Sequence, residues 1–196
     1  MKVAMIPARA GSKRIPKKNI KNFRGKPIIA WSINAAIESK CFDEVIVSTD
    51  SNEIASIAKD YGAKVPFLRP KNLSDDFTTT LEVVMHCLSW LESKNLNAEQ
   101  FCCLYATAPF VKSEDFKNAF KLLNKKKGDK FIYSATTFPS PIQRAIKIDD
   151  NGISSMFFPE FFNSRSQDLE NSYHDSGQFY LASPKIWRTK KNHFET

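Results

Sequence analysis

The 196-residue sequence contains no C-x-x-C pair and no apolar run approaching the roughly eighteen residues of a membrane span. Its cysteines are Cys41, Cys87, Cys102 and Cys103, and the adjacent pair would point to opposite faces of a strand. Without paired motifs, they are interpreted as small buried thiols of a reducing compartment. The first apolar run is too short for a signal peptide. These absences predict a soluble, cytoplasmic protein of one domain.

The opening of the chain lacks negative charge. No acidic residue precedes Glu38, and the net charge of the whole sequence is +8. Nine cations come before that glutamate: Lys2, Arg9, Lys13, Arg14, Lys17, Lys18, Lys21, Arg24 and Lys26. Such a positive field favours an anionic ligand. Nucleic acid is the rival ligand, but no recognition helix or RNA-binding sheet motif accompanies these cations, so a compact anion is preferred.

The residues between Ile6 and Asn19 concentrate this charge in one loop. They follow a predicted strand, Val3–Ile6, and combine small residues with lysine and arginine before a predicted helix. Small residues let backbone N–H groups approach a phosphate, and the cations neutralise its charge. The loop matches neither G-x-G-x-x-G nor the Walker pattern. The residues themselves therefore predict phosphate binding but leave the enzyme class open.

Strand and helix patterns alternate along the first half of the chain, which predicts an α/β fold with right-handed crossovers. The predicted elements are a helix from Pro27, a strand over 43–49, a helix capped by Asp50 or Ser51 and closed by Gly62, and a strand over 64–68. Asp50 is interpreted as a helix cap in preference to a metal ligand.

The pattern continues with a helix after Thr79, which has capping-box spacing to Glu82. His86 lies off the apolar stripe of that helix, so it is interpreted as a surface or packing residue. The later elements are a strand over 101–105, a helix capped by Ser113 that ends in lysines 125–127 and stops at Gly128, and a strand over 131–135.

From Phe138 onward the pattern changes to a β-hairpin. Segments 145–148 and 153–158 flank the turn Asp149–Gly152, a strong hairpin signal. The nearby aromatic residues are Phe157, Phe158, Phe161 and Phe162. An exposed apolar hairpin is a natural dimer surface, and packing within the chain is the equal alternative.

Taken as a string, A-R-A-G-S-K-R-I-P-K-K-N (Ala8–Asn19) resembles the signature loop of the CMP-sugar synthetases, cytidylyltransferases that activate acidic sugars. Further similar motifs are V-S-T-D (Val47–Asp50), L-R-P (Leu68–Pro70), L-S-D-D (Leu73–Asp76) and A-T-A-P (Ala106–Pro109). The resemblance implies a Rossmann-like nucleotidyltransferase three-layer sandwich. Its sheet would be mostly parallel, with a β-hairpin excursion over 138–175 from a single domain spanning 1–196.

The same resemblance implies which residues form the site. Arg9 and Lys18 would be catalytic, by neutralising the triphosphate of CTP. The nucleotide-binding set would be Ala8, Arg9, Ala10, Gly11, Ser12, Lys18, Asn19, Ser74 and Thr107. Loop capping is the competing interpretation for Ser74. The residues expected to contact the sugar are Tyr105, Arg165, His174, Asp175 and Gln178, because arginine pairs with carboxylates and glutamine bonds to hydroxyl or acetamido groups.

Several motifs bear on the sugar. Tyr105 stands where sialic acid synthetases usually have glutamine, and His174–Gly177 departs from their Arg-Pro-Asn-Gly-like run, which disfavours N-acetylneuraminate. In contrast, F-P-x-P-I-Q-R-A from Phe138, R-S-Q-D-L-E from Arg165 and Y-H-D-S-G-Q-F-Y from Tyr173 look like the branch that activates pseudaminic acid for bacterial surface glycans such as those of flagella. Legionaminic and sialic acids are the alternatives.

The resemblance also implies a homodimer and a divalent metal such as Mg²⁺, with neither nucleic acid nor membrane as partner. The sugar's anomeric hydroxyl would attack the α-phosphate of CTP and release pyrophosphate. Family members carry a further C-terminal segment with an Asp-x-Asp metal motif, which these 196 residues do not include. Either the sequence is a fragment or this protein lacks part of its catalytic apparatus. The second hypothesis is therefore a protein that binds nucleotide but is catalytically idle. The metal ligands stay unassigned.

Overall fold

The computed structural model describes residues 1–126 and 130–189. The chain divides into two compact units. The first unit comprises Met1–Tyr133 and Gly177–Thr196, and the second comprises Ser134–Ser176. The predicted excursion over 138–175 lies within the second unit.

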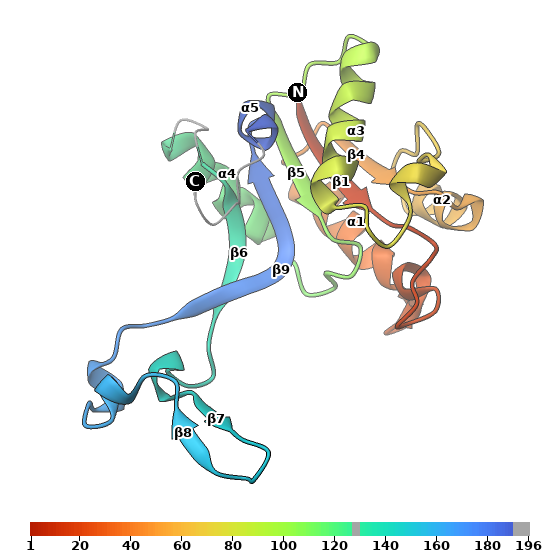
Figure 1. The fold of residues 1–196 in the computed structure, drawn as a ribbon. Helices are drawn as coiled ribbons and strands as arrows, with labels where there is room; N and C mark the ends of the chain where they lie inside the picture. The colour runs from red at the N-terminus through yellow and green to blue at the C-terminus, as the bar shows by residue number, and fades with distance from the viewer. Residues whose placement is uncertain (127–129, 190–196) are drawn as a thin grey trace. The chain divides into compact units, whose positions relative to one another are not determined.

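The main sheet has five strands in the order β4-β1-β5-β9-β6 (Figure 1). Their bounds are β1 Lys2–Pro7, β4 Glu44–Ser48, β5 Gln100–Leu104, β6 Ile132–Thr137 and β9 Tyr173–Ala182. Strand β1 pairs in parallel with β4 on one edge and β5 on the other, and β9 runs antiparallel to β5. The sheet is therefore mixed and mostly parallel, and the predicted α/β class is confirmed.

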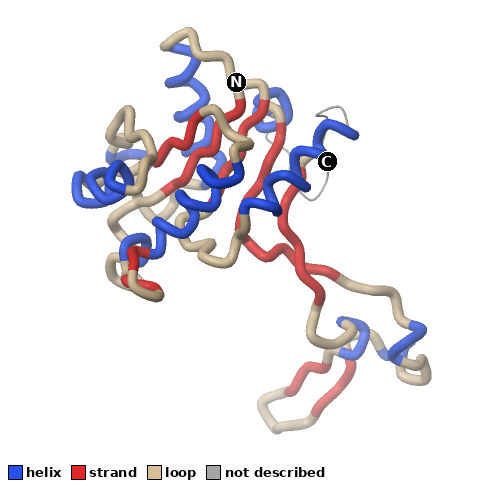
Figure 2. The backbone as a smooth tube through the Cα atoms, turned by 180° about the vertical axis from the view of Figure 1, so that it is seen from behind, coloured by secondary structure: helices blue, strands red, loops and turns tan. Residues whose placement is uncertain are grey.

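Helices cover both faces of the strands in the first unit (Figure 2). Their bounds are α1 Ile28–Ser39, α2 Asn52–Asp60, α3 Thr80–Ser93, α4 Ser113–Lys125 and α5 Pro184–Arg188. Ala4 and Ile6 of β1 face a core shared with α1, α2 and α4, whereas Val3 and Met5 face a core shared with α3 and Trp187 of α5. This alternation produces the predicted three layers.

Strand β5 follows the same rule. Cys102 belongs to the first of these cores and Cys103 to the second, and both are fully buried. The prediction that these neighbouring thiols point to opposite faces is confirmed. Each face of the sheet thus buries one cysteine of the pair.

Several predicted helix ends have the expected chemistry. The Thr79 side chain accepts a hydrogen bond from the Glu82 N–H, and the Glu82 carboxylate accepts the Thr79 N–H at 2.7 Å. Gly62 follows the C-cap of α2 with φ +89°, a conformation that favours glycine. Helix α1 begins directly after Pro27. Short local patterns therefore set these boundaries.

Two predicted details are wrong. Residues 64–68 form two isolated bridges, Lys64 to Ile46 of β4 and Leu68 to Thr49 just after it, instead of a continuous strand, because Pro66 has no N–H to donate. Ser113 is the first residue of α4, not its cap: the cap is Lys112, whose N–H donates to the Asp115 carboxylate at 2.8 Å. The lysine at 127 and the predicted stop at Gly128 lie outside the described residues.

The remaining elements of the first unit are short. They are the 3-10 turns η1 Lys18–Ile20 and η2 Lys71–Leu73, and the two-stranded ribbon of β2 Asn22–Phe23 with β3 Lys26–Pro27. Within the described residues, no helix combines the length and apolar character needed to cross a membrane.

The second unit contains the predicted hairpin, made of β7 Ile146–Ile148 and β8 Ser154–Met156. At its turn, the Asp149 carboxylate accepts the N–H groups of Asn151 and Ile153, and Gly152 has φ +80°. Three 3-10 turns complete the unit: η3 Ile142–Arg144, η4 Pro159–Phe161 and η5 Ser166–Asp168. Arg144 donates to the carbonyls of Phe162 and Ser164, which ties η3 to the segment after η4.

The first core makes a stability prediction. Phe116 of α4 is fully buried, and its ring lies 5.2 Å from the rings of both Phe42 and Phe179. Phe116→Ala should lower the free energy of unfolding by about 3–5 kcal/mol, because it removes apolar contacts and leaves a cavity. Urea unfolding measures the change. The control is Leu122→Ala on the exposed face of α4, expected to change it by less than about 0.5 kcal/mol. Equal effects would contradict this assignment of faces.

Candidate active site

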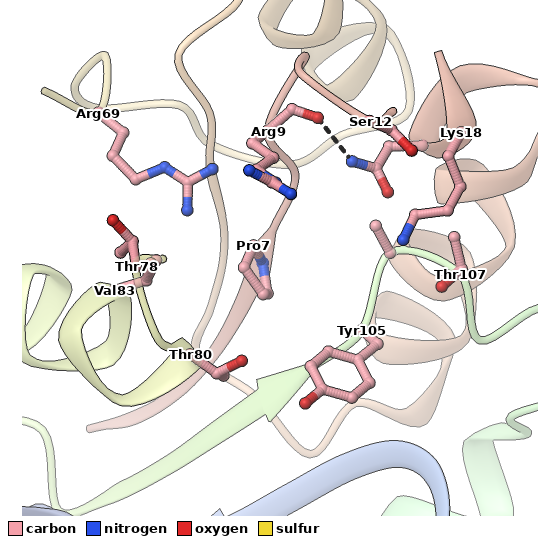
Figure 3. A pocket seen from close by; sticks show the side chains of 12 residues that line it. Pro7, Arg9, Ser12, Lys18, Arg69, Thr78, Thr80, Val83, Tyr105 and Thr107 are labelled. Carbon is pink, nitrogen blue, oxygen red and sulfur yellow. Dashed lines mark hydrogen bonds between the residues drawn. The ribbon is translucent and has the colours of Figure 1, made fainter. Parts of the chain in front are cut away.

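A cavity of about 360 Å³ opens beyond the carboxyl ends of β1 and β5 in the first unit (Figure 3). The chain passes from β1 to β4 on one side and later returns to β5 on the other, and ligands of open α/β sheets bind at such a switch point. The lining residues are Pro7, Arg9, Ser12, Lys18, Asn19, Arg69, Thr78, Thr80, Val83, Tyr105, Ala106 and Thr107. They include three cations and no acid, which suits an anionic ligand.

The loop after β1 is attached to the core at its start. Ala8 is fully buried, and its N–H donates to the Ser48 carbonyl at 2.9 Å. At the other end of the loop, Lys17 adopts a left-handed conformation with φ 51° before η1. This reversal returns the chain to the cavity, where Lys18 and Asn19 are lining residues.

Arg9 has partners in the segment after η2. Its guanidinium lies 2.7 Å from the Asp76 carboxylate and donates to the Asp75 carbonyl. Lys13 pairs with the other oxygen of Asp76. Hydrogen bonds from Lys13 and from Arg9 lower the pKa of the Asp76 carboxyl below its ordinary value. The Asp76 carboxylate thus competes with a phosphate for the positive charges of Arg9 and Lys13.

Lys18 differs from Arg9 in this respect. Within residues 1–126 and 130–189, its ammonium group makes no ion pair and donates to no side chain. In Figure 3 the ammonium group points toward Thr107, in the segment that follows β5. A half-buried lysine directed into an acid-free cavity is well placed to contact an anion.

Arg69 was not among the site residues predicted from the sequence. It is only 5% exposed, and its Nε and Nη2 atoms have no hydrogen-bond partner in the described part of the chain. Burial lowers the pKa of this arginine, and the charge of Asp50 opposes that shift. A buried cation with unused donors is stabilised when an anion binds. The L-R-P motif marked the position, but residue letters do not reveal that its arginine is buried.

The interpretation of Asp50 as a helix cap is wrong. Ser51 caps α2, because its hydroxyl accepts the Ile54 N–H at 3.3 Å. The Asp50 carboxylate instead accepts the Ala10 N–H at 2.9 Å. Asp50 therefore fixes the loop after β1 by a hydrogen bond, although Asp50 is not itself among the residues that line the cavity.

The cavity brings six of the predicted site residues together: Arg9, Ser12, Lys18, Asn19, Tyr105 and Thr107. Ala8 lies in the core beside it, and Ala10 and Gly11 are exposed in the loop. Ser74 is outside the lining, and its hydroxyl donates to the Pro70 carbonyl at 3.0 Å, as loop capping predicts. Gln178 lies next to the site, since its carbonyl accepts the Tyr105 N–H at 2.9 Å.

The other predicted sugar contacts, Arg165, His174 and Asp175, belong to the second unit. Arg165 lines a cavity of about 480 Å³ in that unit together with Asp168. The exposed His174 ring lies 4.9 Å from the Phe138 ring, and its Nδ1 is 3.0 Å from the Asp175 carbonyl oxygen. His86, in contrast, packs edge-on against Phe67 at 4.8 Å, in agreement with a packing role.

Comparison with known proteins identifies the chemistry of this class of site. The cytidylyltransferase family model matches residues 3–150. The chain belongs to the cytidylyltransferase family. It is therefore a nucleotidyltransferase enzyme of a family that uses CTP.

Particular relatives refine the likeness. The chain is 46% identical to a pseudaminic acid cytidylyltransferase of Campylobacter jejuni, over 94% of this chain and 79% of that protein. It is 36% identical to a CMP-N,N'-diacetyllegionaminic acid synthase of Legionella pneumophila, over 93% of this chain and 78% of that protein. A solved CMP:2-keto-3-deoxy-manno-octonic acid synthetase complexed with CTP shares the fold, with a TM-score of 0.69 at 16% identity, covering 96% of this chain and 77% of that one.

The Asp76 ion pairs generate a prediction about CTP. Asp76→Asn should strengthen CTP binding about two- to fivefold, because Arg9 and Lys13 no longer share a competing charge. Calorimetric titration measures the dissociation constant, and the gain should shrink at high ionic strength. Glu53→Gln is the control, since Glu53 pairs with Lys17, which does not line the cavity. Weaker binding by Asp76→Asn would instead mean that Asp76 orients Arg9 for the nucleotide.

Proposed function

We propose that this cytidylyltransferase couples CTP to pseudaminic acid, giving CMP-pseudaminic acid and pyrophosphate. The observation that carries the proposal is the higher identity to the relative named for pseudaminic acid than to the relative named for legionaminic acid, at nearly equal coverage. The product would supply bacterial surface glycans such as those on flagellin. A place in the cytoplasm accords with this role, since four free cysteines, three of them buried, suit that compartment.

In the proposed reaction, the anomeric hydroxyl oxygen of the sugar forms a bond to the α-phosphorus of CTP. The bond from that phosphorus to the oxygen bridging to the β-phosphate breaks, pyrophosphate leaves with that electron pair, and the proton of the attacking hydroxyl passes to solvent. Little covalent chemistry is required of the protein, so positioning and charge stabilisation dominate. Arg9 and Lys18 would be the catalytic cations, and Arg69 would add a third positive group from a buried position.

The loop after β1 would hold the triphosphate. We assign this role to the loop residues Ala8–Ser12 with Asn19, through backbone N–H groups and the Ser12 hydroxyl. Thr107 and, less directly, Ser74 would contact the nucleoside. The support is the gathering of Ser12, Asn19 and Thr107 around one cavity.

The residues proposed to contact the sugar are the five expected from the sequence. Tyr105 lines the cavity and Gln178 pairs with its backbone, which supports proposing both as sugar contacts. Arg165, His174 and Asp175 of the second unit are proposed as further contacts to its carboxylate and hydroxyl groups. Their chemistry, not their placement, carries that part of the proposal.

A divalent metal such as Mg²⁺ is expected for this reaction. The described residues contain no group of three or more acidic, histidine or cysteine side chains that could hold one. Mg²⁺ at such sites is held by one or two carboxylates together with substrate phosphates and water, so we propose that it arrives with CTP and assign it no step. Pyrophosphate release that persists in excess EDTA would contradict a metal requirement.

A homodimer is proposed from the surface of the second unit. Its exposed apolar side chains include Ile146, Ile148, Ile153, Phe157 and Phe162. Such a concentration in one short segment is typical of a protein interface. Sedimentation at micromolar concentration tests this: a monomer would contradict the proposal.

The first test is pyrophosphate release from CTP and Mg²⁺ with pseudaminic, legionaminic and N-acetylneuraminic acids offered separately. We expect release with pseudaminic acid at a kcat/KM at least about tenfold above the other two, since a few hydrogen bonds separate these sugars. Preference for legionaminic acid would replace the proposed substrate. Retained CTP binding without release from any sugar would support a nucleotide-binding, catalytically idle protein.

Lys18 provides a second test of the same reaction. Lys18→Ala should lower kcat on the order of 10²-fold, by loss of one preorganised electrostatic group. Lys21→Ala is the matched control, because Lys21 is an exposed lysine three positions later that does not line the cavity. Near-normal turnover by Lys18→Ala would remove this lysine from the mechanism.

A further inference from the structure

One peptide group of the loop after β1 is held on both sides. The carbonyl of Arg9 accepts a hydrogen bond from the Asn19 side-chain amide at 2.9 Å, drawn as the dashed line in Figure 3. The N–H of Ala10 donates to the Asp50 carboxylate, also at 2.9 Å. These two atoms belong to the same planar peptide unit. Fixing both of its polar atoms fixes the orientation of the whole plane.

The two side chains that hold this peptide come from different parts of the fold. Asn19 belongs to η1 and is only 7% exposed, so its amide is confined by packing. Asp50 follows the carboxyl end of β4, directly after Thr49, whose carbonyl accepts the Arg69 N–H at 2.7 Å. Asp50 therefore connects the loop to the end of a sheet strand by a hydrogen bond, and Asn19 connects the start of the loop to its far end.

The orientation of this peptide controls cavity-facing groups. Arg9 contributes its guanidinium to the cavity, and its Cα lies on one side of the fixed plane. Gly11 and Ser12 follow on the other side, and a Cβ at Gly11 would meet no atom within 4 Å, so the backbone there is open to approach. Rotation of the plane would move the Arg9 side chain and the following N–H groups together.

We propose that Asn19 and Asp50 are positioning residues that lock the Arg9–Ala10 peptide and so aim Arg9 and the loop N–H groups at the triphosphate. The activity part of this inference rests on the proposed function, whereas the loop geometry does not. Asn19 acts here as a donor to the protein backbone, and Asp50 acts as an acceptor. A small displacement of such groups is enough to reduce the rate of a reaction that depends on alignment.

The chemistry of each position defines the variants. Asp50→Asn keeps a side-chain oxygen that accepts the Ala10 N–H, whereas Asp50→Ala removes the acceptor. Asn19→Ala removes the donor, and Asn19→Asp places a carboxylate against the Arg9 carbonyl at nearly unchanged shape. Ser51→Ala is the matched control, because it removes the α2 cap next to Asp50 and leaves the peptide contacts intact.

Two readouts separate this inference from the proposed function. Amide hydrogen exchange of the loop is measured in the ligand-free protein, and kcat and KM for CTP are measured in the pyrophosphate assay. Asp50→Ala and Asn19→Ala should each raise exchange at residues 9–12 by about tenfold or more, because local opening becomes easier. Their kcat should fall about tenfold or more with a smaller change in KM, as expected for lost alignment.

The conservative variants decide the outcome. Asp50→Asn should stay within about threefold of the wild type in loop exchange, and Asn19→Asp should be at least as impaired as Asn19→Ala. Ser51→Ala should lower the thermal midpoint without altering exchange in the loop. Unchanged exchange in both alanine variants, or equal damage by Asp50→Asn and Asp50→Ala, would overturn the inference. An inactive wild type with the expected exchange pattern would reject the proposed function alone.

Discussion

Parallel hydrogen bonding of β1 to both of its neighbours places the candidate site residues of this protein at one edge of the sheet. Pairing with β4 aligns Pro7 with Ser48, and pairing with β5 aligns Met5 with Cys103. The segments that follow these strands therefore emerge side by side, although they are far apart in sequence. The cationic loop, Asp50 and the Tyr105–Thr107 segment meet for this reason, and a shift of either register would separate them.

The sequence predicted what depends on local pattern. The strands, the capping box at Thr79 and the hairpin around Gly152 each have their cause within a few residues, so they are visible without tertiary information. The string from Ala8 to Asn19 likewise marked the site, because its charge and small residues are contiguous. The broken strand at 64–68 shows the limit: its apolar residues favour a strand, but Pro66 interrupts the ladder.

What the sequence left out depends on burial and on long-range contacts. Arg69 becomes a candidate site residue only because the fold buries its guanidinium beside the cavity. Asp50 was given the commonest role for an acid before a helix, but the neighbouring serine fills that role and the carboxylate turns to the loop. Polar residues such as Arg165 and His174 can bind many kinds of ligand, so the residue type alone does not define a role.

The two cysteines of β5 can serve as chemical probes of partial unfolding. Cys102 and Cys103 are neighbours in sequence but are shielded by different helical layers, and burial raises the pKa of both thiols. Thiolate is the reactive form, so neither reacts in the closed fold, whereas Cys41 is partly accessible. The order in which alkylating reagents modify Cys102 and Cys103 during partial unfolding would therefore reveal which layer of helices detaches from the sheet first.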